Sequence, residues 1–163
     1  MIVIGIDPGT ARMGYGILEY SKKSPHKIKL IKSGVFITKP DQDQQNRLLQ
    51  LYRNINELID SHKPDSIVIE KLFFNTNAKT AMIVGQARGI VMLSAADNNL
   101  KMFEYTALQA KLVLTGYGRS DKKEMQEAVR KTLSLKEVIK SDDANDAVAM
   151  ALCYLKKEYD IAI

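Results

Sequence analysis

The order of strand-like and helical segments restricts the fold of this chain more than any other feature of its sequence. Three apolar, strand-like segments, at about 2–7, 13–20 and 28–38, fill the first 38 residues and are separated by short polar turns. Turns of this length join antiparallel neighbours, so these segments predict an antiparallel meander at the start of the chain.

Helical periodicity and further strands then alternate along the rest of the chain. The remaining predicted elements are helices at 44–62 and 78–97, strands at 66–70 and 101–105, and later helices at about 106–114, 120–133 and 142–158. This order predicts an α/β fold with a five-stranded mixed sheet, in which the first three strands are antiparallel and helices flank the sheet.

The composition is that of a globular protein with a basic surface. The chain has 163 residues, of which 45% are hydrophobic and 26% charged, so residues 1–163 are expected to form a single domain. No apolar run approaches the ~20 residues of a membrane helix, and no signal peptide is expected. Cys153 is the one cysteine and favours a reducing, cytoplasmic location. The net charge of +5 modestly favours a polyanionic partner such as a nucleic acid.

Acidic residues lie at the ends of the most apolar predicted elements. Asp7 closes the first strand and Glu70 closes the fourth, whereas Asp142, Asp143 and Asp146 open the last helix. Strand ends in an α/β sheet converge on one edge. Residues three or four apart share a helix face, so Asp143 and Asp146 can point together, as can Asp142 and Asp146. The helix behind them is apolar nearly all round, which predicts its burial against the sheet and brings its acids close to the strand ends.

Converging carboxylates favour a divalent metal site. Their charges repel one another unless a cation binds or some of them are protonated. Oxygen ligands favour Mg²⁺ or Mn²⁺ over zinc, and His26, His62 and Cys153 offer no zinc-ligand spacing. Two Mg²⁺ ions about 4 Å apart suit hydrolysis of a phosphodiester. Spacing alone leaves simpler roles open, namely turn capping by Asp7, a surface charge at Glu70 and compensation of the dipole of the last helix.

Short motifs follow one another along essentially the whole chain. Each is weak alone, but the ordered set is highly specific. The motifs are Gly5-Ile6-Asp7-Pro8-Gly9, Gly14-Tyr15-Gly16, Ile69-Glu70 followed by Phe73, Gly85-Gln86-Ala87-Arg88-Gly89, Glu104-Tyr105 with Lys111, Gly116-Tyr117-Gly118 with Lys122, and Asp143-Ala144-Asn145-Asp146-Ala147. In this order they resemble the RuvC family of Holliday-junction resolvases.

The resemblance implies a ribonuclease-H-like fold, a homodimer and metal-dependent cleavage of four-way DNA junctions. The family nicks two opposed strands at symmetric positions and leaves 5′-phosphate ends that can be ligated, in homologous recombination and DNA repair. It works with the RuvA–RuvB branch-migration motor. The helix at 79–97 is implied to lie in the dimer interface, although its small residues Gly85 and Gly89 suit close packing within the monomer equally well.

The resemblance also implies roles for individual residues. The implied metal ligands, which would hold two Mg²⁺ or Mn²⁺ ions per active site, are Asp7, Glu70, Asp143 and Asp146. Lys111 and Lys122 are implied to support catalysis and to contact DNA, although from the residues alone they also suit solvated helix positions. Phe73 is implied to contact bases at the junction. From the residues alone Phe73 fits a core position or a base-stacking wedge, and the polar residues 75–77 that follow it favour the wedge.

Other functions share parts of this pattern. The segment Gly5-Ile6-Asp7-Pro8-Gly9-Thr10 also resembles the phosphate-binding turn of actin-like sugar kinases and heat-shock ATPases, which need a second such turn that this sequence lacks. The YqgF group of small resolvase-like nucleases acting on RNA shares the first acid, but the Phe73 loop and the paired Asp143 and Asp146 favour the RuvC family. A non-catalytic junction-binding module would be expected to lose an acid, and all four are present.

Overall fold

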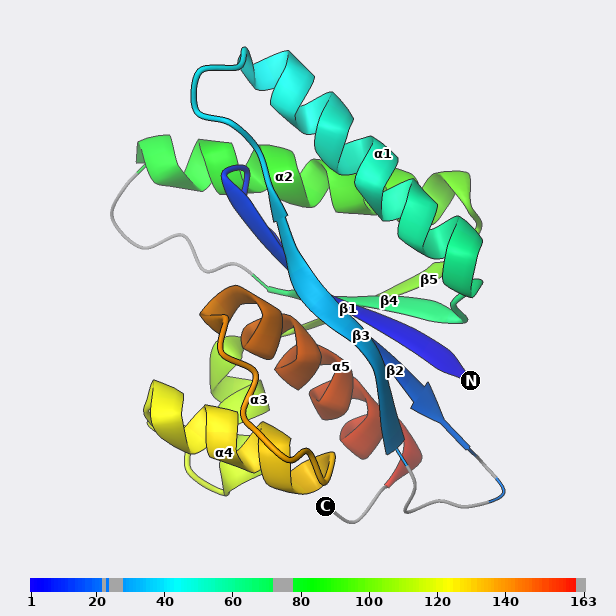
Figure 1. The fold of residues 1–163 in the computed structure, drawn as a ribbon, viewed down its shortest axis with the longest axis vertical. Helices are drawn as coiled ribbons and strands as arrows, with labels where there is room; N and C mark the ends of the chain where they lie inside the picture. Colours follow the sequence, from blue (N-terminus) through cyan, green and yellow to red (C-terminus); the bar gives the residue numbers. More distant parts are fainter. Residues whose placement is uncertain (22, 24–27, 72–77, 161–163) are drawn as a thin grey trace.

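The protein is built on a mixed sheet with the strand order β3-β2-β1-β4-β5 (Figure 1). The structure is a computed structural model that describes residues 1–21, 23, 28–71 and 78–160. β1 pairs antiparallel with β2, and β2 with β3, whereas β4 is parallel to both β1 and β5. The strands are β1 (Ile2–Asp7), β2 (Arg12–Tyr20), β3 (Ile28–Ile37), β4 (Ser66–Glu70) and β5 (Lys101–Tyr105).

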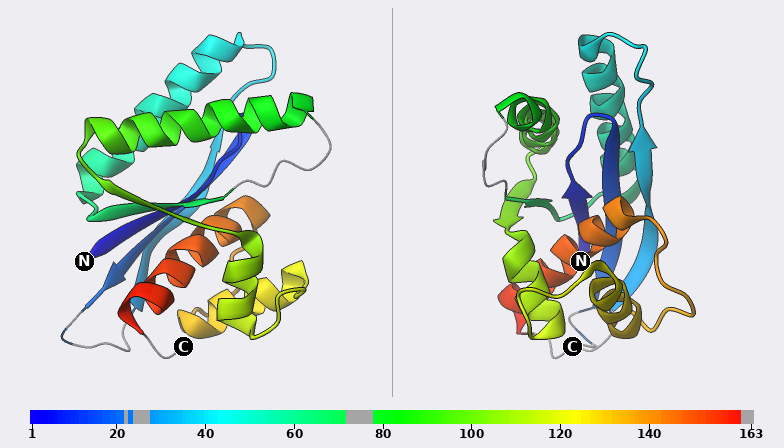
Figure 2. Two further views of the ribbon diagram at one scale, coloured as in Figure 1. Left: turned by 180° about the vertical axis from the view of Figure 1, so that it is seen from behind. Right: turned by 90° about the vertical axis from the view of Figure 1, so that its left-hand side faces the viewer.

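Helices cover both faces of this sheet (Figures 1 and 2). α1 and α2 lie together on one face. α5 lies against the other face, and α3 and α4 pack beside it. The helices are α1 (Gln44–His62), α2 (Ala78–Asp97), α3 (Ala107–Thr115), α4 (Lys122–Thr132) and α5 (Asp142–Tyr159).

Alternation of side chains along the strands assigns one set of residues to each face. Ile4 and Ile6 of β1 pack in the apolar cluster beneath α1 and α2. Val3 of β1 and Val68 of β4 pack in the cluster beneath α5. Because successive residues of a strand point to opposite faces, the odd-numbered residues of β1 and the even-numbered residues of β4 face α5.

Two strand glycines let α5 lie directly on the sheet. A Cβ atom on Gly5 of β1 would overlap the carbonyl oxygen of Ala147, and one on Gly14 of β2 would overlap the carbonyl oxygen of Asp143. The missing side chains therefore admit the backbone of the first two turns of α5. This close packing positions the start of α5 over the end of β1 and the beginning of β2.

The predicted fold class is confirmed, and helix caps explain where boundaries differ. α3 begins one residue later than predicted because Thr106 is its N-cap, in a reciprocal capping box with Gln109. It ends at Gly116, which takes a left-handed φ of 78°. Ser141 caps α5 through a 3.5 Å hydrogen bond from the Ala144 backbone N–H. Asp142 and Asp143 are therefore in the first turn of α5, and neither is its cap.

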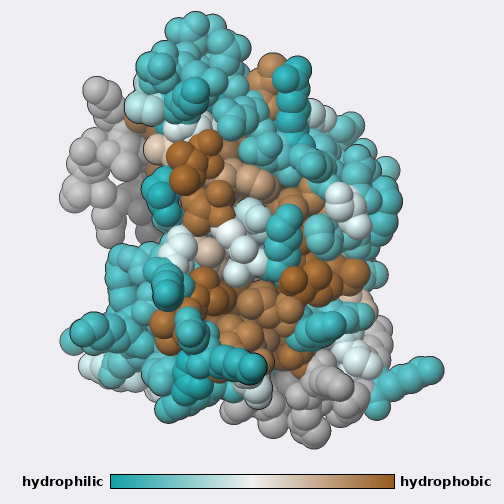
Figure 3. All heavy atoms as spheres, viewed as in Figure 1, coloured by the Kyte–Doolittle hydropathy of each residue, from teal (hydrophilic) through white to brown (hydrophobic). Residues whose placement is uncertain are grey.

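The surface in Figure 3 is hydrophilic over α1 and α4, and apolar side chains gather between them, where β3 crosses the view. Among the residues that the structure describes, no helix combines the length and the apolar character that a membrane span requires.

Candidate active site

Asp7 and Glu70 lie beside each other at the carboxyl edge of the sheet. β1 and β4 are parallel neighbours, paired in register up to Ile6 and Ile69, and the next residue on each strand is the acid. Both acids follow the alternation that points toward α5. The sheet thus contributes two neighbouring carboxylates to the face that α5 covers.

The first turns of α5 bring Asp143 and Asp146 to the same edge. Asp7 pairs across the β1–β2 ladder with Gly14. Because Gly14 has no side chain, the backbone at Asp143 lies directly over it. Asp146 follows three residues later, about one helical turn, and so shares a face with Asp143. The backbone geometry therefore brings the strand-end acids and the helix acids to the same edge of the sheet, as the sequence predicted.

Burial and mutual repulsion raise the pKa values of three of these acids. The pKa of Asp7 is raised to about 7, first by burial and then by the carboxylates of Glu70, Asp146 and Asp143. Burial also raises the pKa of Glu70, with a contribution from Asp146. The pKa of Asp146 is raised by burial and then by Asp142. A bound cation would therefore stabilise the ionised forms of these carboxylates.

The pKa of Asp7 predicts that the metal-free protein is more stable at mildly acidic pH. Its pKa is about 7 in the folded state and 3.8 in the reference state. Between these values the folded state holds a proton that the unfolded state has released, so the free energy of unfolding falls as pH rises toward 7. We expect a loss of about 2 kcal/mol between pH 5.5 and pH 8, at about 1.4 kcal/mol per pH unit below the folded pKa.

Urea unfolding in EDTA at the two pH values measures this loss. Asp7→Asn is expected to reduce the difference, because asparagine does not titrate. Equal stability of the wild-type protein at pH 5.5 and pH 8 would contradict the raised pKa of Asp7.

Lys111 and Lys122 line a small cavity together with two of the acids. The cavity has a volume of about 190 Å³, and α3, α4 and α5 contribute to its wall. Its charged lining residues are Glu70, Lys111, Lys122 and Asp146. Both lysines implied by the resemblance thus lie at the acid cluster, where an ammonium group can neutralise a phosphate.

Two ion pairs flank the acids at the start of α5. Arg12 Nε donates a 2.7 Å hydrogen bond to Asp143 Oδ2. Lys122 Nζ donates a 2.7 Å hydrogen bond to Asp142 Oδ2, and Gln126 Nε2 donates to Asp142 Oδ1 at 3.2 Å. The hydrogen bond with Asp142 raises the pKa of Lys122. The two neighbouring aspartates therefore face different elements, β2 and α4.

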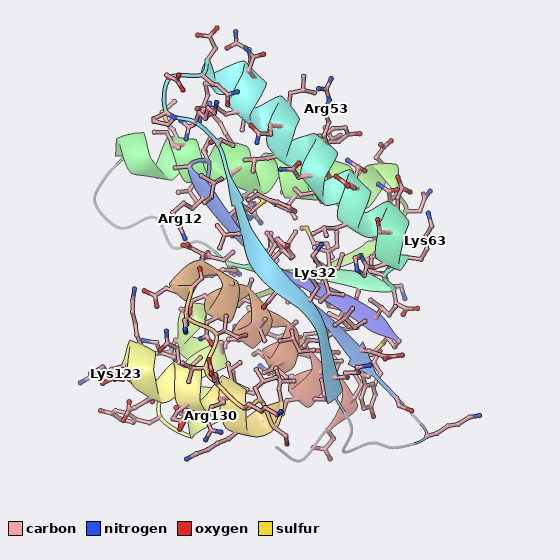
Figure 4. The ribbon with its side chains drawn as sticks, viewed as in Figure 1. Arg12, Lys32, Arg53, Lys63, Lys123 and Arg130 are labelled. Carbon is pink, nitrogen blue, oxygen red and sulfur yellow. The ribbon has the colours of Figure 1, made fainter. Side chains whose placement is uncertain are left out.

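Sequence reasoning missed Arg12. In Figure 4 Arg12 lies near the start of α5, whereas Arg53 and Lys123 extend from the outer faces of α1 and α4. Arg12 lies five residues after Asp7 in the sequence but 131 residues before its partner Asp143. A basic residue after a turn gives no indication of such a partner, so nothing in the local pattern could have identified it.

The chemistry of the donor set fits divalent metal ions. In the described ranges no three acidic, histidine or cysteine side chains are arranged as a metal shell, and Asp143 is instead paired with Arg12. The four implied ligands nevertheless offer oxygen donors, which Mg²⁺ and Mn²⁺ prefer. Burial raises the pKa of Asp7, and the three neighbouring carboxylates raise it further by repulsion. A divalent cation would relieve that repulsion.

One predicted site residue cannot be placed. Phe73, the proposed base-contacting wedge, lies outside the described residues. Lys71, the last described residue before it, donates its backbone N–H to the Tyr105 carbonyl oxygen. Backbone pairing with β5 thus continues one residue past Glu70.

Comparison with known proteins connects this site to a nuclease family. The model of the family described as "Crossover junction endodeoxyribonuclease RuvC" matches residues 3–154. The chain belongs to the RuvC family. The match spans β1 through most of α5, so it includes all four acids and both lysines of the candidate site.

Members of the RuvC family are similar to this chain over nearly its full length. A crossover junction endodeoxyribonuclease RuvC from Alkaliphilus oremlandii is 46% identical over 154 residues, covering 94% of this chain and 92% of the relative. One from Roseiflexus sp. is 47% identical over 151 residues, covering 93% and 88%. The structure titled "T. thermophilus RuvC in complex with Holliday junction substrate" has a TM-score of 0.89 at 29% identity, covering 99% of this chain and 98% of that one.

Proposed function

We propose that this protein is an endonuclease that resolves four-way DNA junctions by nicking two opposed strands at symmetric positions. The observation that carries the proposal is the convergence of acids from β1, β4 and α5 at one sheet edge, beside two lysines. Membership of the RuvC family supplies the substrate class. The cellular process would be homologous recombination and DNA repair.

The proposed catalytic residues divide into carboxylates and lysines. Nucleases of the RuvC family depend on metal ions. Asp7, Glu70, Asp143 and Asp146 would hold two Mg²⁺ or Mn²⁺ ions, which when bound activate water and stabilise the leaving oxygen. Lys111 and Lys122 would donate hydrogen bonds to phosphate oxygens and offset the charge that develops as the phosphodiester is hydrolysed. Cleavage would leave 5′-phosphate ends.

Two opposed nicks require two active sites, and one helix face of this chain suits a two-fold dimer. A Cβ atom added at Gly85 or Gly89 of α2 would meet no atom within 4 Å in the described part of the chain. Met82 and Leu93 on the same helix are 68% and 55% exposed. The glycines therefore do not serve close packing within the described monomer, and we propose that a second copy packs on this face of α2.

The dimer proposal predicts that Gly89→Glu gives a folded monomer. The added side chain has space in the monomer, and replacing glycine removes a poor helix former. In a two-fold dimer it would block close approach and place like charges together. Light scattering after gel filtration measures the mass. Arg53→Glu, an exposed position on α1, is the matched control and should remain dimeric, and a dimeric Gly89→Glu variant would contradict this interface.

The function is tested by a nicking assay on a synthetic mobile four-way junction and a matched linear duplex. Reactions would contain Mg²⁺, Mn²⁺ or EDTA, and both opposed strands would carry end labels. We expect paired symmetric nicks in the junction alone, with either metal and not with EDTA. Equal cutting of the duplex, or cutting that persists in EDTA, would argue against a metal-dependent resolvase.

Four further assignments complete the proposal. Phe73 would contact bases at the junction, and the RuvA–RuvB branch-migration complex would be the protein partner, both from the family resemblance. The buried free thiol of Cys153 is compatible with the reducing cytoplasm as the proposed location. Residues 1–163 are proposed to form one domain.

A further inference from the structure

The two adjacent aspartates at the start of α5 have different partners. Asp143 accepts a hydrogen bond from Arg12 on β2. Asp142 faces α4, where its Oδ2 accepts from Lys122 Nζ at 2.7 Å and its Oδ1 accepts from Gln126 Nε2 at 3.2 Å. Both oxygens of Asp142 are thus engaged by side chains one turn apart on α4.

The position of Lys122 at the start of α4 explains why its ammonium group needs an acidic partner to hold it near the cavity. Lys122 is the first residue of α4, directly after the N-cap Asp121. A positive charge there meets the positive end of the helix dipole, which favours a side-chain rotamer that carries the ammonium away. The side chain is also long and flexible. The Asp142 carboxylate offsets the positive charge of Lys122 at the helix start and holds its ammonium group through a hydrogen bond. Gln126 in turn holds the Asp142 carboxylate through a second hydrogen bond.

This ion pair is better suited to placing a charge than to stabilising the fold. The side chains of Lys122 and Asp142 are 77% and 48% exposed. Exposed pairs of this kind contribute little to the free energy of unfolding. Lys122 also lines the cavity that contains Glu70 and Asp146. The pair therefore keeps an ammonium group at the edge of the acid cluster.

We propose that Asp142 is a positioning residue that holds the Lys122 ammonium at this cavity for a phosphate oxygen of the cleaved strand, and that it is not a metal ligand. An ammonium has three donors, so Lys122 can bind Asp142 and a phosphate at the same time. This inference rests on the proposed function. It assigns separate tasks to the two aspartates, with Asp143 serving the metal ions and Asp142 serving the lysine.

A double-mutant cycle tests the inference on single-turnover nicking of the junction. D142A is expected to slow nicking about 10- to 100-fold, the usual effect of removing a residue that orients an active-site side chain at a metal centre. K122A should slow it at least as much, and D142A/K122A no more than K122A alone. D142E, which keeps the charge, should recover most of the rate. D60N removes an exposed ion pair of 3.0 Å between Asp60 and Lys63 at the end of α1, which lies far from α4 and α5 in the sequence, and should nick as the wild type does.

A Mn²⁺ titration by calorimetry separates positioning from metal binding. D142A should lose much less Mn²⁺ affinity than D143A, because it removes a charge near Asp146 but no proposed ligand. Additive losses in D142A/K122A, Mn²⁺ binding by D142A as weak as that by D143A, or wild-type nicking by D142A would each overturn the inference. If wild-type protein nicks no junction at all, the proposed function fails instead.

Discussion

Replacement of Asp7 by asparagine is expected to abolish junction nicking and to leave junction binding intact. Asp7 is the acid whose charge Glu70, Asp146 and Asp143 all oppose, so it lies at the centre of the cluster. Asparagine keeps the shape but removes the charge that would hold a cation. We expect the single-turnover rate to fall about 1,000-fold or more, equivalent to about 4 kcal/mol of transition-state stabilisation. The basic surface that binds phosphates is unchanged, so a gel shift in EDTA should show wild-type affinity.

Thermal unfolding provides an independent readout of the same variant. In EDTA at pH 8, Asp7→Asn is expected to raise the melting temperature because it removes a buried, repelled charge. Asp41→Asn, at an exposed position before α1, is the matched control and should change neither the rate nor the melting temperature. Nicking at the wild-type rate, or a parallel loss of nicking and binding, would exclude Asp7 as a metal ligand.

Replacement of Gly14 by alanine is expected to destabilise the protein and to impair nicking through the position of α5. The added methyl group would overlap the backbone of Asp143 and Ala144, and a helix backbone cannot move aside as a flexible side chain can. We expect a loss of about 3 kcal/mol in the free energy of unfolding, the upper end of the usual cost of overpacking. Urea unfolding measures the loss, and nicking at low temperature, where the variant stays folded, measures displacement of the acids.

Gly118→Ala is the matched control for this effect. Its added methyl group would meet the flexible end of Leu108 at 3.1 Å, and no backbone is closer than 4.0 Å in the described part of the chain. It should therefore cost much less stability than Gly14→Ala. Equal stabilities of the two variants would show that α5 does not depend on Gly14 for its seat.

The sequence predicted the elements of the fold because periodicity and turn residues are local signals. Three strands joined by short turns had to be antiparallel, and helices between the later strands made the sheet mixed. The acids Asp7 and Glu70 could be placed for the same reason, since each closes a strand whose ends meet at one edge. Family motifs added the lysines, which local spacing alone leaves as ordinary helix residues.

Other features of the site depend on contacts between distant segments, which spacing cannot reveal. Spacing left Asp142 and Asp143 equally able to join Asp146. Their partners Lys122 and Arg12 lie on other elements, 20 and 131 residues away. The sequence also allowed the α2 glycines to pack within the monomer. In the described part of the structure, no other element packs against Gly85 or Gly89. Local sequence patterns determine the helices and strands, whereas the packing of those elements determines which side chains meet.

The packing of α5 on Gly5 and Gly14 also determines when the proposed active site is complete. It joins the first strand of the element order to the last helix, so the contact forms late during synthesis. A growing chain on the ribosome that already contains Asp7 and Glu70 still lacks the acids of α5. A fragment that loses α5 to a protease likewise retains half of the carboxylates. The proposed active site is therefore complete only in molecules whose translation and folding have reached α5.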